Sequence, residues 1–293
     1  MTALRMLPPI LELRPPWPDE IPRLKTIFKA TGPIGAFRPL VLVAKEPERL
    51  VGGVLILEPD SPSGIVSCLL SVRPAWRGGA AHEALLDAAG ALTRELGAHT
   101  IAFSFTGESP DVPWLESRGA RIFQEDVFYE GNVLTFRERI SPLLRRAREH
   151  AERFVVRPLR EDDHAPVSSM VAAHGLMDEE RARARLSRRY DPRLCMVCTE
   201  QDRIVGAILT ISADNGRFYI ENRVVAPDYM ASSSSINLRL LDAISMVGQA
   251  AGFTSFRFSC QPGKDRETVN FARRCGCRAI RRQIRVHLRL TPA

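Results

Sequence analysis

Alternating hydrophobic and polar positions predict a series of short strands and helices in the first half of the chain. An apolar stretch at 11–14 predicts a strand, prolines end it, and Asp19 can cap a helix that runs to about Lys29. The next two apolar stretches predict the strands of a hairpin, at 40–44 and 50–57. A third strand, a tight turn, a helix, a strand, a helix and a final strand complete the predicted series.

The same series returns in the second half. A strand at 154–158 ends at a proline, and Asp162 or Asp163 precedes the next helix. The two hairpin strands follow at 195–199 and 204–211. The hairpin turns of the two halves align at a constant offset of 154, from Glu48–Leu55 to Asp202–Leu209. This period is far longer than a solenoid repeat and indicates a duplicated domain.

These observations predict an α+β fold of two tandem domains, each a mixed, mostly antiparallel sheet flanked by helices. The domains are expected at 1–130 and 154–293. Between them, 131–153 predicts a helix rich in arginine, which we interpret as a charged linker exposed to solvent. The final strand of one copy can pair with the other copy or with another chain, and periodicity does not choose between them.

A tight turn of small residues joins a strand to a helix at 72–82. The strand ends at Pro74 and the helix begins before Leu85, so several backbone N–H groups converge at a helix N-terminus. Those amides are unpaired, and the helix dipole is positive at that end. The turn therefore predicts an anion-binding site.

The corresponding turn of the second half lies at 225–235. It keeps a proline and an aromatic residue, Pro227 and Tyr229, and lacks the Arg-Gly pair. Its serines can offer amides and hydroxyls to a phosphate at a helix N-terminus. A polar loop that has lost the phosphate site is the alternative, and the sequence leaves both open.

The first turn resembles motif A of the GNAT N-acetyltransferase superfamily, where a V-x-P-x-[YW]-R-G-x-G-x-[GA] turn cradles the pyrophosphate of acetyl-CoA. Ala80 stands where the family has its second glycine, and His82 where it has a third small residue. With the hairpins, the resemblance extends over both halves, each with a degenerate motif. It implies that acetyl-CoA or another acyl-CoA is the cofactor. The implied binding positions are Val72, Arg77, Gly78, Gly79, Ala80, Ala81, His82, Val225, Ser232, Ser233, Ser234 and Ser235.

The resemblance also implies a general base on the strand before the turn, because acyl transfer to an amine needs a group that takes the amine's proton. Glu221 stands at that position, six residues before Pro227, whereas the first half has Cys68 there. A carboxylate in an apolar strand needs a partner or a cleft, so Glu221 is the candidate catalytic residue. Pairing with an arginine such as Arg223, or exposure to solvent, is the alternative.

Other expected catalytic positions are not filled in the family's way. The tyrosine that acts as leaving-group acid has no counterpart, since Leu115 and Ala272 stand at its two positions. His82 is an alternative base, but a structural histidine explains it as well, because the dipole at a helix start disfavours its positive form. The basic run at 181–189 favours an anionic acceptor if two of its arginines reach the cleft, and a solvated helix face otherwise.

Composition narrows the classes of function. No apolar run approaches the roughly 20 residues that cross a bilayer, and Met1–Pro9 lacks the signal-peptide pattern, so a cytoplasmic location is expected. Most of the excess positive charge lies in 154–293, with 22 Lys and Arg against 15 Asp and Glu. It can attract a phosphorylated cofactor, while nucleic-acid binding is not favoured because no recognised motif accompanies it. Cys195 and Cys198 would point to opposite faces of a strand, which favours core cysteines over a metal site.

The sequence thus predicts an acyl-CoA-dependent N-acyltransferase acting on an amine of a small molecule or a protein. The alternative is a non-catalytic protein of two degenerate GNAT domains that serves as an acyl-CoA sensor or a partner-binding module. Glu221 favours the enzyme, and the missing acid in both halves favours the alternative. A homo-oligomer remains open.

Overall fold

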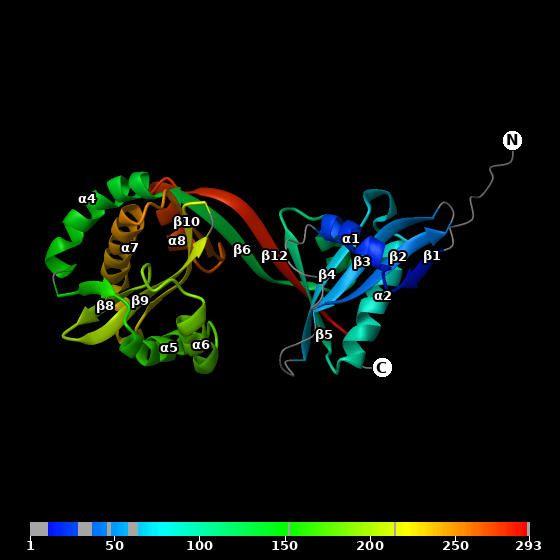
Figure 1. Ribbon diagram of the computed structural model, residues 1–293, viewed down its shortest axis with the longest axis horizontal. Helices are drawn as coiled ribbons and strands as arrows, with labels where there is room; N and C mark the ends of the chain where they lie inside the picture. Colours follow the sequence, from blue (N-terminus) through cyan, green and yellow to red (C-terminus); the bar gives the residue numbers. More distant parts are fainter. Residues whose placement is uncertain are drawn as a thin grey trace. The chain divides into compact units, whose positions relative to one another are not determined.

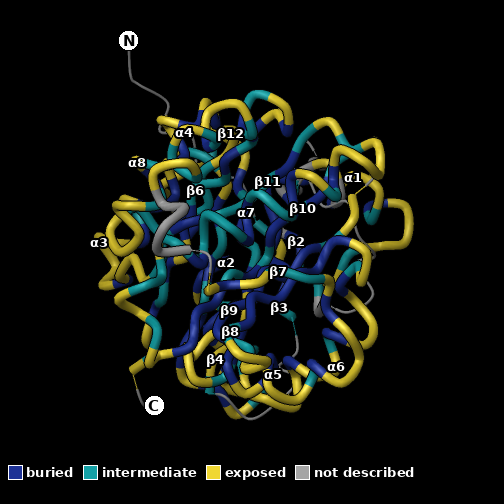
Figure 2. The backbone as a smooth tube through the Cα atoms, turned by 90° about the vertical axis from the view of Figure 1, so that its left-hand side faces the viewer, coloured by how far each residue is buried: buried dark blue, intermediate teal, exposed yellow. Residues whose placement is uncertain are grey.

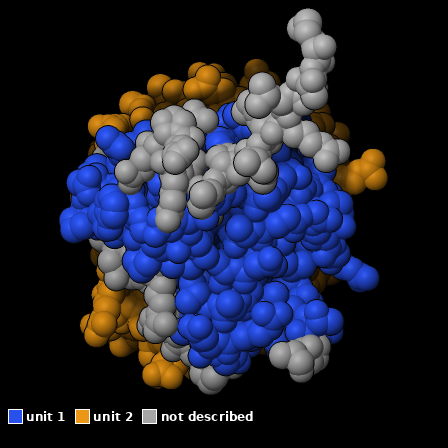
Figure 3. Space-filling view, turned by 90° about the vertical axis from the view of Figure 1, so that its right-hand side faces the viewer, with its two compact units in different colours: residues 1–125, 282–293 blue, residues 126–281 orange. Residues whose placement is uncertain are grey.

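The computed structural model describes residues 11–28, 37–45, 48–57, 64–151, 153–213 and 215–291. The expectations for Met1–Pro9 and for the helix end at Lys29 lie outside these residues. The chain forms two compact units (Figure 3). The first unit contains residues 1–125 and 282–293, and the second contains residues 126–281.

The first unit is a six-stranded sheet with helices on both faces (Figure 1). Its strand order is β1-β2-β3-β4-β5-β12, and only β4 and β5 are parallel. Its strands are β1 (Leu11–Arg14), β2 (Phe37–Lys45), β3 (Glu48–Leu57), β4 (Ile65–Val72), β5 (Thr100–Thr106) and the end of β12 (Arg278–Arg289). Its helices are α1 (Ile21–Phe28), α2 (Ala80–Glu95) and α3 (Asp111–Ser117).

The second unit repeats this plan. Its strand order is β6-β11-β10-β9-β8-β7, and only β10 and β11 are parallel. Its strands are β6 (Arg121–Asn132), β7 (Val155–Pro158), β8 (Met196–Glu200), β9 (Arg203–Ala213), β10 (Arg217–Val225) and β11 (Ser255–Cys260). Its helices are α4 (Val133–Ala151), α5 (His164–Ala173), α6 (Glu179–Arg188), α7 (Ser233–Ala250) and α8 (Arg266–Arg274).

The predicted α+β class and the mostly antiparallel sheets are confirmed, and the strands follow the same order in both halves, whereas, among the described residues, the second half has the additional helix α6 between its first two strands. The expected domain 154–293 needs a correction at its end. The last strand of the second half, β12, pairs with β5 of the first unit, with Gln283 opposite Thr106 and Arg289 opposite Thr100. The last strand of the first half, β6, pairs with β11 of the second unit. Each unit therefore completes its sheet with a strand from the other half of the sequence.

The interpretation of 131–153 as a solvated linker is also corrected. The segment is helical, as α4, but Val133, Phe136 and Ile140 are buried in the core of the second unit. These residues recur at helical spacing and form an apolar stripe along the helix. The composition of the segment does not reveal this stripe, because arginines lie between its members. Helix α4 packs against α7 (Figure 1). It is part of the second unit's core.

Two apolar cores lie on the two faces of the second unit's sheet. One is formed with α4, α7 and α8, and the other with α5 and α6, whose outer residues are exposed (Figure 2). Cys198 belongs to the first core and Cys195 to the second. The predicted opposite orientation of the two cysteines is therefore confirmed, and both are free and buried.

A buried ion pair follows the first strand of each half. Arg14 donates two hydrogen bonds to Glu20, at 2.7 and 3.0 Å, and Arg157 donates two to Asp163, at 2.6 and 2.8 Å. Each carboxylate also accepts a backbone N–H from the residue three positions earlier. Bidentate pairing with such an amide fixes the chain where it turns from the strand into the first helix.

Candidate functional site

The phosphate turn predicted in the first unit has the expected backbone shape. Gly78 has a positive φ of 71°, a conformation that glycine adopts without strain. Gly79 is the N-cap of α2, and the residues from Arg77 to Ala80 are exposed. The N–H of Arg77 donates to the carbonyl of Pro74, so the helix start of Gly79 and Ala80 is the part of the turn whose amides are left for solvent.

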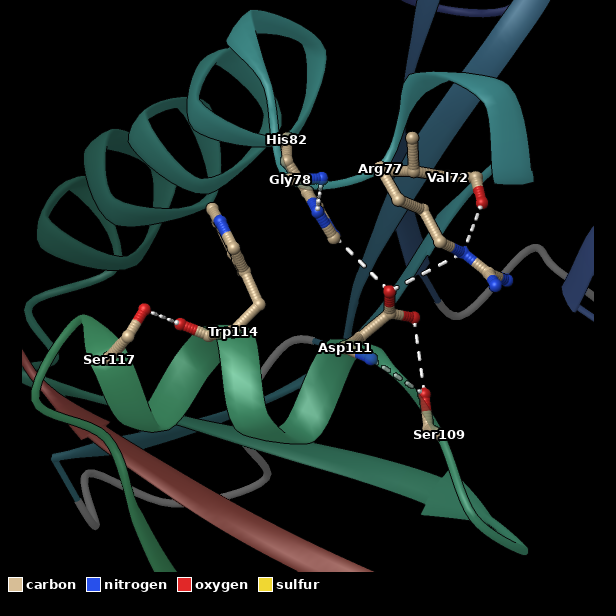
Figure 4. Close-up of polar contacts among 8 residues, drawn as sticks. All are labelled: Val72, Arg77, Gly78, His82, Ser109, Asp111, Trp114 and Ser117. Atoms are coloured by element: carbon tan, nitrogen blue, oxygen red, sulfur yellow. Dashed lines mark hydrogen bonds and ion pairs between the residues drawn. The ribbon is translucent and has the colours of Figure 1, made fainter.

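A side chain from α2 binds this turn from below (Figure 4). The Nδ1 atom of His82 accepts a hydrogen bond from the backbone N–H of Gly78 at 3.0 Å. The imidazole is 1% exposed and stacks on Trp114 of α3, with ring centroids 3.9 Å apart. One of the amides that would face a phosphate is therefore already paired within the first unit.

A buried carboxylate lies beside the same turn. Asp111, at the start of α3, has Oδ1 3.6 Å from Nε of Arg77 and 3.5 Å from Nε2 of His82 (Figure 4). Arg77 also donates a hydrogen bond from Nε to the carbonyl of Val72 at 3.1 Å. The arginine that the resemblance assigns to phosphate is thus held by a carboxylate and a carbonyl, and the negative charge of Asp111 opposes an anion there.

Burial lowers the pKa of His82, because the charged imidazolium loses its hydration. Asp111 and Glu83 oppose this shift of the pKa, and Arg77 adds to it. With Nδ1 accepting from Gly78, the neutral tautomer carries its proton on Nε2, towards Asp111. These contacts describe a structural histidine, one of the two interpretations of the sequence.

The second unit has a cavity where β10 and β11 separate. The two strands pair in parallel from Arg217 and Ser255 to Ile220 and Phe258, and β10 then bulges at Glu221. A cavity of about 230 Å³ follows this point. Phe136, Phe256 and Phe271 contribute apolar walls, and Glu221, Arg223 and Thr268 contribute polar groups.

A second cavity, of about 400 Å³, adjoins the first and lies at the start of α7. The two cavities share Arg223, Leu241, Thr268 and Phe271, and the second also reaches Ser234 and Asn237. We call the two together the second-unit cleft. It runs from the catalytic candidate Glu221 to the N-terminal turn of an 18-residue helix.

Glu221 is ion-paired with two arginines of the basic run. Its Oε1 atom accepts hydrogen bonds from Arg185 at 3.2 Å and from Arg189 at 2.9 Å. Four residues apart, these arginines share one side at the end of α6. Two members of the run therefore contact Glu221, although neither lines the two cavities. Arg223, the partner suggested by the sequence, is not the one that pairs with Glu221.

The structure places the predicted binding positions in two separate groups. Val72 and 77–82 belong to the first unit, and Val225, 232–235 and Glu221 belong to the second. Ser232 is the N-cap of α7 and accepts a hydrogen bond from Arg153 at 2.8 Å, and Ser234 lines the cleft. The carbonyl of Val225 contacts Nε2 of His174 at 2.7 Å.

The positions of the family's acid are buried and apolar in this protein. Leu115 and Ala272 are both 0% exposed. The sequence indicated Arg223 only as a partner of Glu221 and did not indicate Asp265 or Thr268, and all three line the cleft. Arg223 carried a signal, because it is a second charged residue in the apolar strand that contains Glu221. Thr268 and Asp265 carried none, since they are ordinary residues at the start of a helix.

Comparison with solved structures identifies the fold. A GCN5-related N-acetyltransferase from Sphaerobacter thermophilus matches with a TM-score of 0.70 and 16% identity, over 98% of each chain. A tandem GNAT protein from the clavulanic acid biosynthesis pathway matches with a TM-score of 0.59 and 14% identity, over 97% of this chain and 100% of that one. The chain has the GNAT fold in tandem.

A third GNAT structure is a glucosamine N-acetyltransferase region of a fungal multi-domain β-N-acetylglucosaminidase. It matches with a TM-score of 0.68 and 13% identity, over 97% of this chain and 38% of that one. No protein-family model and no curated protein sequence matches the chain. Among the described residues, no helix is both long and apolar enough to cross a membrane.

Proposed function

We propose that this GNAT-fold protein is an acyl-CoA-dependent N-acyltransferase whose working site is the second-unit cleft. Acetyl-CoA or another acyl-CoA is the donor, and an amine of a small molecule or a protein is the acceptor. The observation that carries the proposal is that two adjoining cavities share four lining residues, one of them lined by Glu221 and the other by Ser234 in the first turn of α7. The proposed base and the proposed anion-binding helix start thus line adjoining cavities.

The residues present fit an acyl-CoA. The N–H of Ser233 donates to the carbonyl of Met230, so the following amides in the first turn of α7 and the hydroxyl of Ser234 are the groups suited to its phosphates. The buried Oδ1 of Asn237 accepts no hydrogen bond from the described residues and can receive an amide N–H of the pantetheine arm. The first unit offers less, because His82 and Asp111 already contact its turn.

Glu221 would take the proton of the acceptor amine. Its position at a bulge turns its side chain out of the regular alternation of β10. Arg185 and Arg189 hold the carboxylate of Glu221 in place. Two guanidinium groups around one carboxylate leave a net positive charge there, which suits an acceptor that carries a carboxylate or a phosphate. With apolar residues at both acid positions, the thiolate of CoA would leave without help from a residue at those positions.

A pair of matched variants tests which unit binds the cofactor. Ala80 and Ser234 are both exposed in the first turn of their helices, and an acidic residue is favourable there for helix stability. Ser234→Asp should weaken acetyl-CoA binding at least tenfold in calorimetry through repulsion of the phosphates, and Ala80→Asp should leave it unchanged. The reverse pattern would place the cofactor in the first unit, and no binding by the wild type would refute the proposal.

A non-catalytic acyl-CoA sensor is the second candidate. The double ion pair of Glu221 favours it, because Oε1 of the carboxylate already accepts hydrogen bonds from two guanidinium groups. Release of CoA from acetyl-CoA in the presence of a panel of amines separates the two functions. Binding without any turnover supports the sensor.

A further inference from the structure

Arg223 lies where the two cavities of the second-unit cleft adjoin, because it lines both of them. It extends from β10 towards α8, where one of its Nη atoms donates a hydrogen bond to Oγ1 of Thr268 at 3.2 Å. This is its single hydrogen bond with the described residues. A guanidinium has five N–H donors, so most of its donor capacity is left for other groups in the cleft.

The charge of Arg223 also lacks a close counterion. Within the described part of the chain, no carboxylate forms an ion pair with it, and Asp265 attracts it only at longer range. Asp265 itself accepts the backbone N–H of Gln261 at 2.8 Å. Desolvation lowers the pKa of Arg223, because burial disfavours the charged form.

Buried charges in proteins are normally paired, because the loss of hydration is otherwise uncompensated. Two partly buried arginines of this protein are paired in this way, Arg14 with Glu20 and Arg157 with Asp163. Arg223 departs from it at the wall of a cavity. A ligand that brings an oxyanion into the cleft would supply the missing partner.

We propose that Arg223 binds an oxyanion, a phosphate or a carboxylate group, of the ligand that occupies the second-unit cleft. This inference rests on the proposed function and deepens it, since it names the kind of group on the acyl-CoA donor that Arg223 binds. The oxyanion has two sources. It belongs either to the phosphates of CoA, near Ser234, or to a terminal carboxylate of the acyl chain, near Glu221.

Arg223→Gln is the test variant, and Arg217→Gln is its matched control, because Arg217 lies on the same strand and does not line the cleft. Calorimetry with acetyl-CoA, succinyl-CoA and S-acetylpantetheine measures the affinities. Loss of a charge-assisted hydrogen bond should weaken binding of the anionic probes about tenfold to a hundredfold in Arg223→Gln. The control should bind like the wild type.

The probes distinguish the two sources. An equal loss for acetyl-CoA and succinyl-CoA, with S-acetylpantetheine unaffected, assigns the oxyanion to the phosphates. A loss confined to succinyl-CoA assigns it to the acyl carboxylate. Unchanged affinity for all three probes overturns the inference while the proposed function stands.

Two further measurements keep the outcomes separate. If Arg223 served only the fold, Arg223→Gln would lower the melting temperature and leave affinities unchanged; a ligand-binding role predicts an equal or higher melting temperature, since a desolvated cation is removed. If the wild type binds no CoA compound, the proposed function fails. Pyrophosphate and succinate then test Arg223 directly, and binding of neither overturns the inference.

Discussion

The imidazole of His82 and the backbone N–H of Gly78 form a 3.0 Å hydrogen bond, so the phosphate turn of the first unit is held by a side chain of the helix that follows it. Trp114 stacks on the face of the same ring. In the turn that most resembles motif A, one backbone amide is therefore already bonded to a side chain of the first unit. The less complete turn of the second unit adjoins a cleft.

This contact predicts a pH dependence of the first unit. Burial lowers the pKa of His82 below the value of about 6.5 in the unfolded chain. Below that pH the unfolded chain binds the proton more strongly, so the free energy of unfolding should fall as the pH drops from 7 to 5. All three tryptophans lie in residues 1–125, so tryptophan fluorescence during urea unfolding reports on this unit.

His82→Gln should flatten this dependence, because glutamine does not titrate. A proton NMR titration gives the same information directly, and the signal missing from His82→Gln identifies the residue. A midpoint for His82 at or above 6.5 would contradict the prediction.

The Arg157–Asp163 pair predicts acid sensitivity of the second unit. Hydrogen bonds from Arg157 hold the pKa of Asp163 below its usual range. The contribution of Asp163 to stability is therefore complete above about pH 4 and is lost as the pH falls through the lowered pKa. Asp163→Asn should cost about 2 kcal/mol at pH 7, measured by calorimetry. Its exposed neighbour Asp162 is the control, and an equal loss in Asp162→Asn would disprove the role of the pair.

The period of the hydrophobic pattern was enough to predict much of the fold. Each strand of the hairpins was placed to within a few residues, and the period of two correctly oriented Cys195 and Cys198. The partner of the final strands could not be predicted. A strand such as β12 carries the same pattern whichever edge it pairs with, and its pairing with β5 joins residues far apart in the sequence.

The candidate site was less predictable, because its decisive contacts are also long-range. The sequence around His82 does not predict its contacts with Asp111 and Trp114, because both residues lie on α3, about 30 positions later. The basic run contains five arginines, and the sequence did not show that Arg185 and Arg189 are the two that contact Glu221. Arg223 was visible only as a charge in an apolar strand, and its cavity needed the packing of α7 and α8.

The close packing of Gly206 against α7 leaves no room for a larger side chain. A Cβ atom at this position would lie 2.6 Å from Cγ2 of Ile236 and 3.3 Å from the carbonyl of Val224. Gly206→Ala should therefore lower the free energy of unfolding by about 1–3 kcal/mol. Gly263 has open space around its Cβ position, so Gly263→Ala should change stability by less than about 0.5 kcal/mol. Equal stability of the two variants in thermal unfolding would show that β9 and α7 yield at this contact.

Glu221 predicts a split between catalysis and binding in the proposed acyl transfer. Glu221→Gln keeps the shape of the side chain but cannot accept the amine's proton, so kcat should fall about 10²–10⁴-fold while the affinity for acetyl-CoA stays within twofold. Glu179→Gln, on the exposed face of α6, is the control and should keep full activity. Steady-state rates of CoA release measure both variants. Because a base acts only in the chemical step, an unchanged kcat in Glu221→Gln would remove Glu221 from the mechanism and leave its pairs with Arg185 and Arg189 as a purely structural contact.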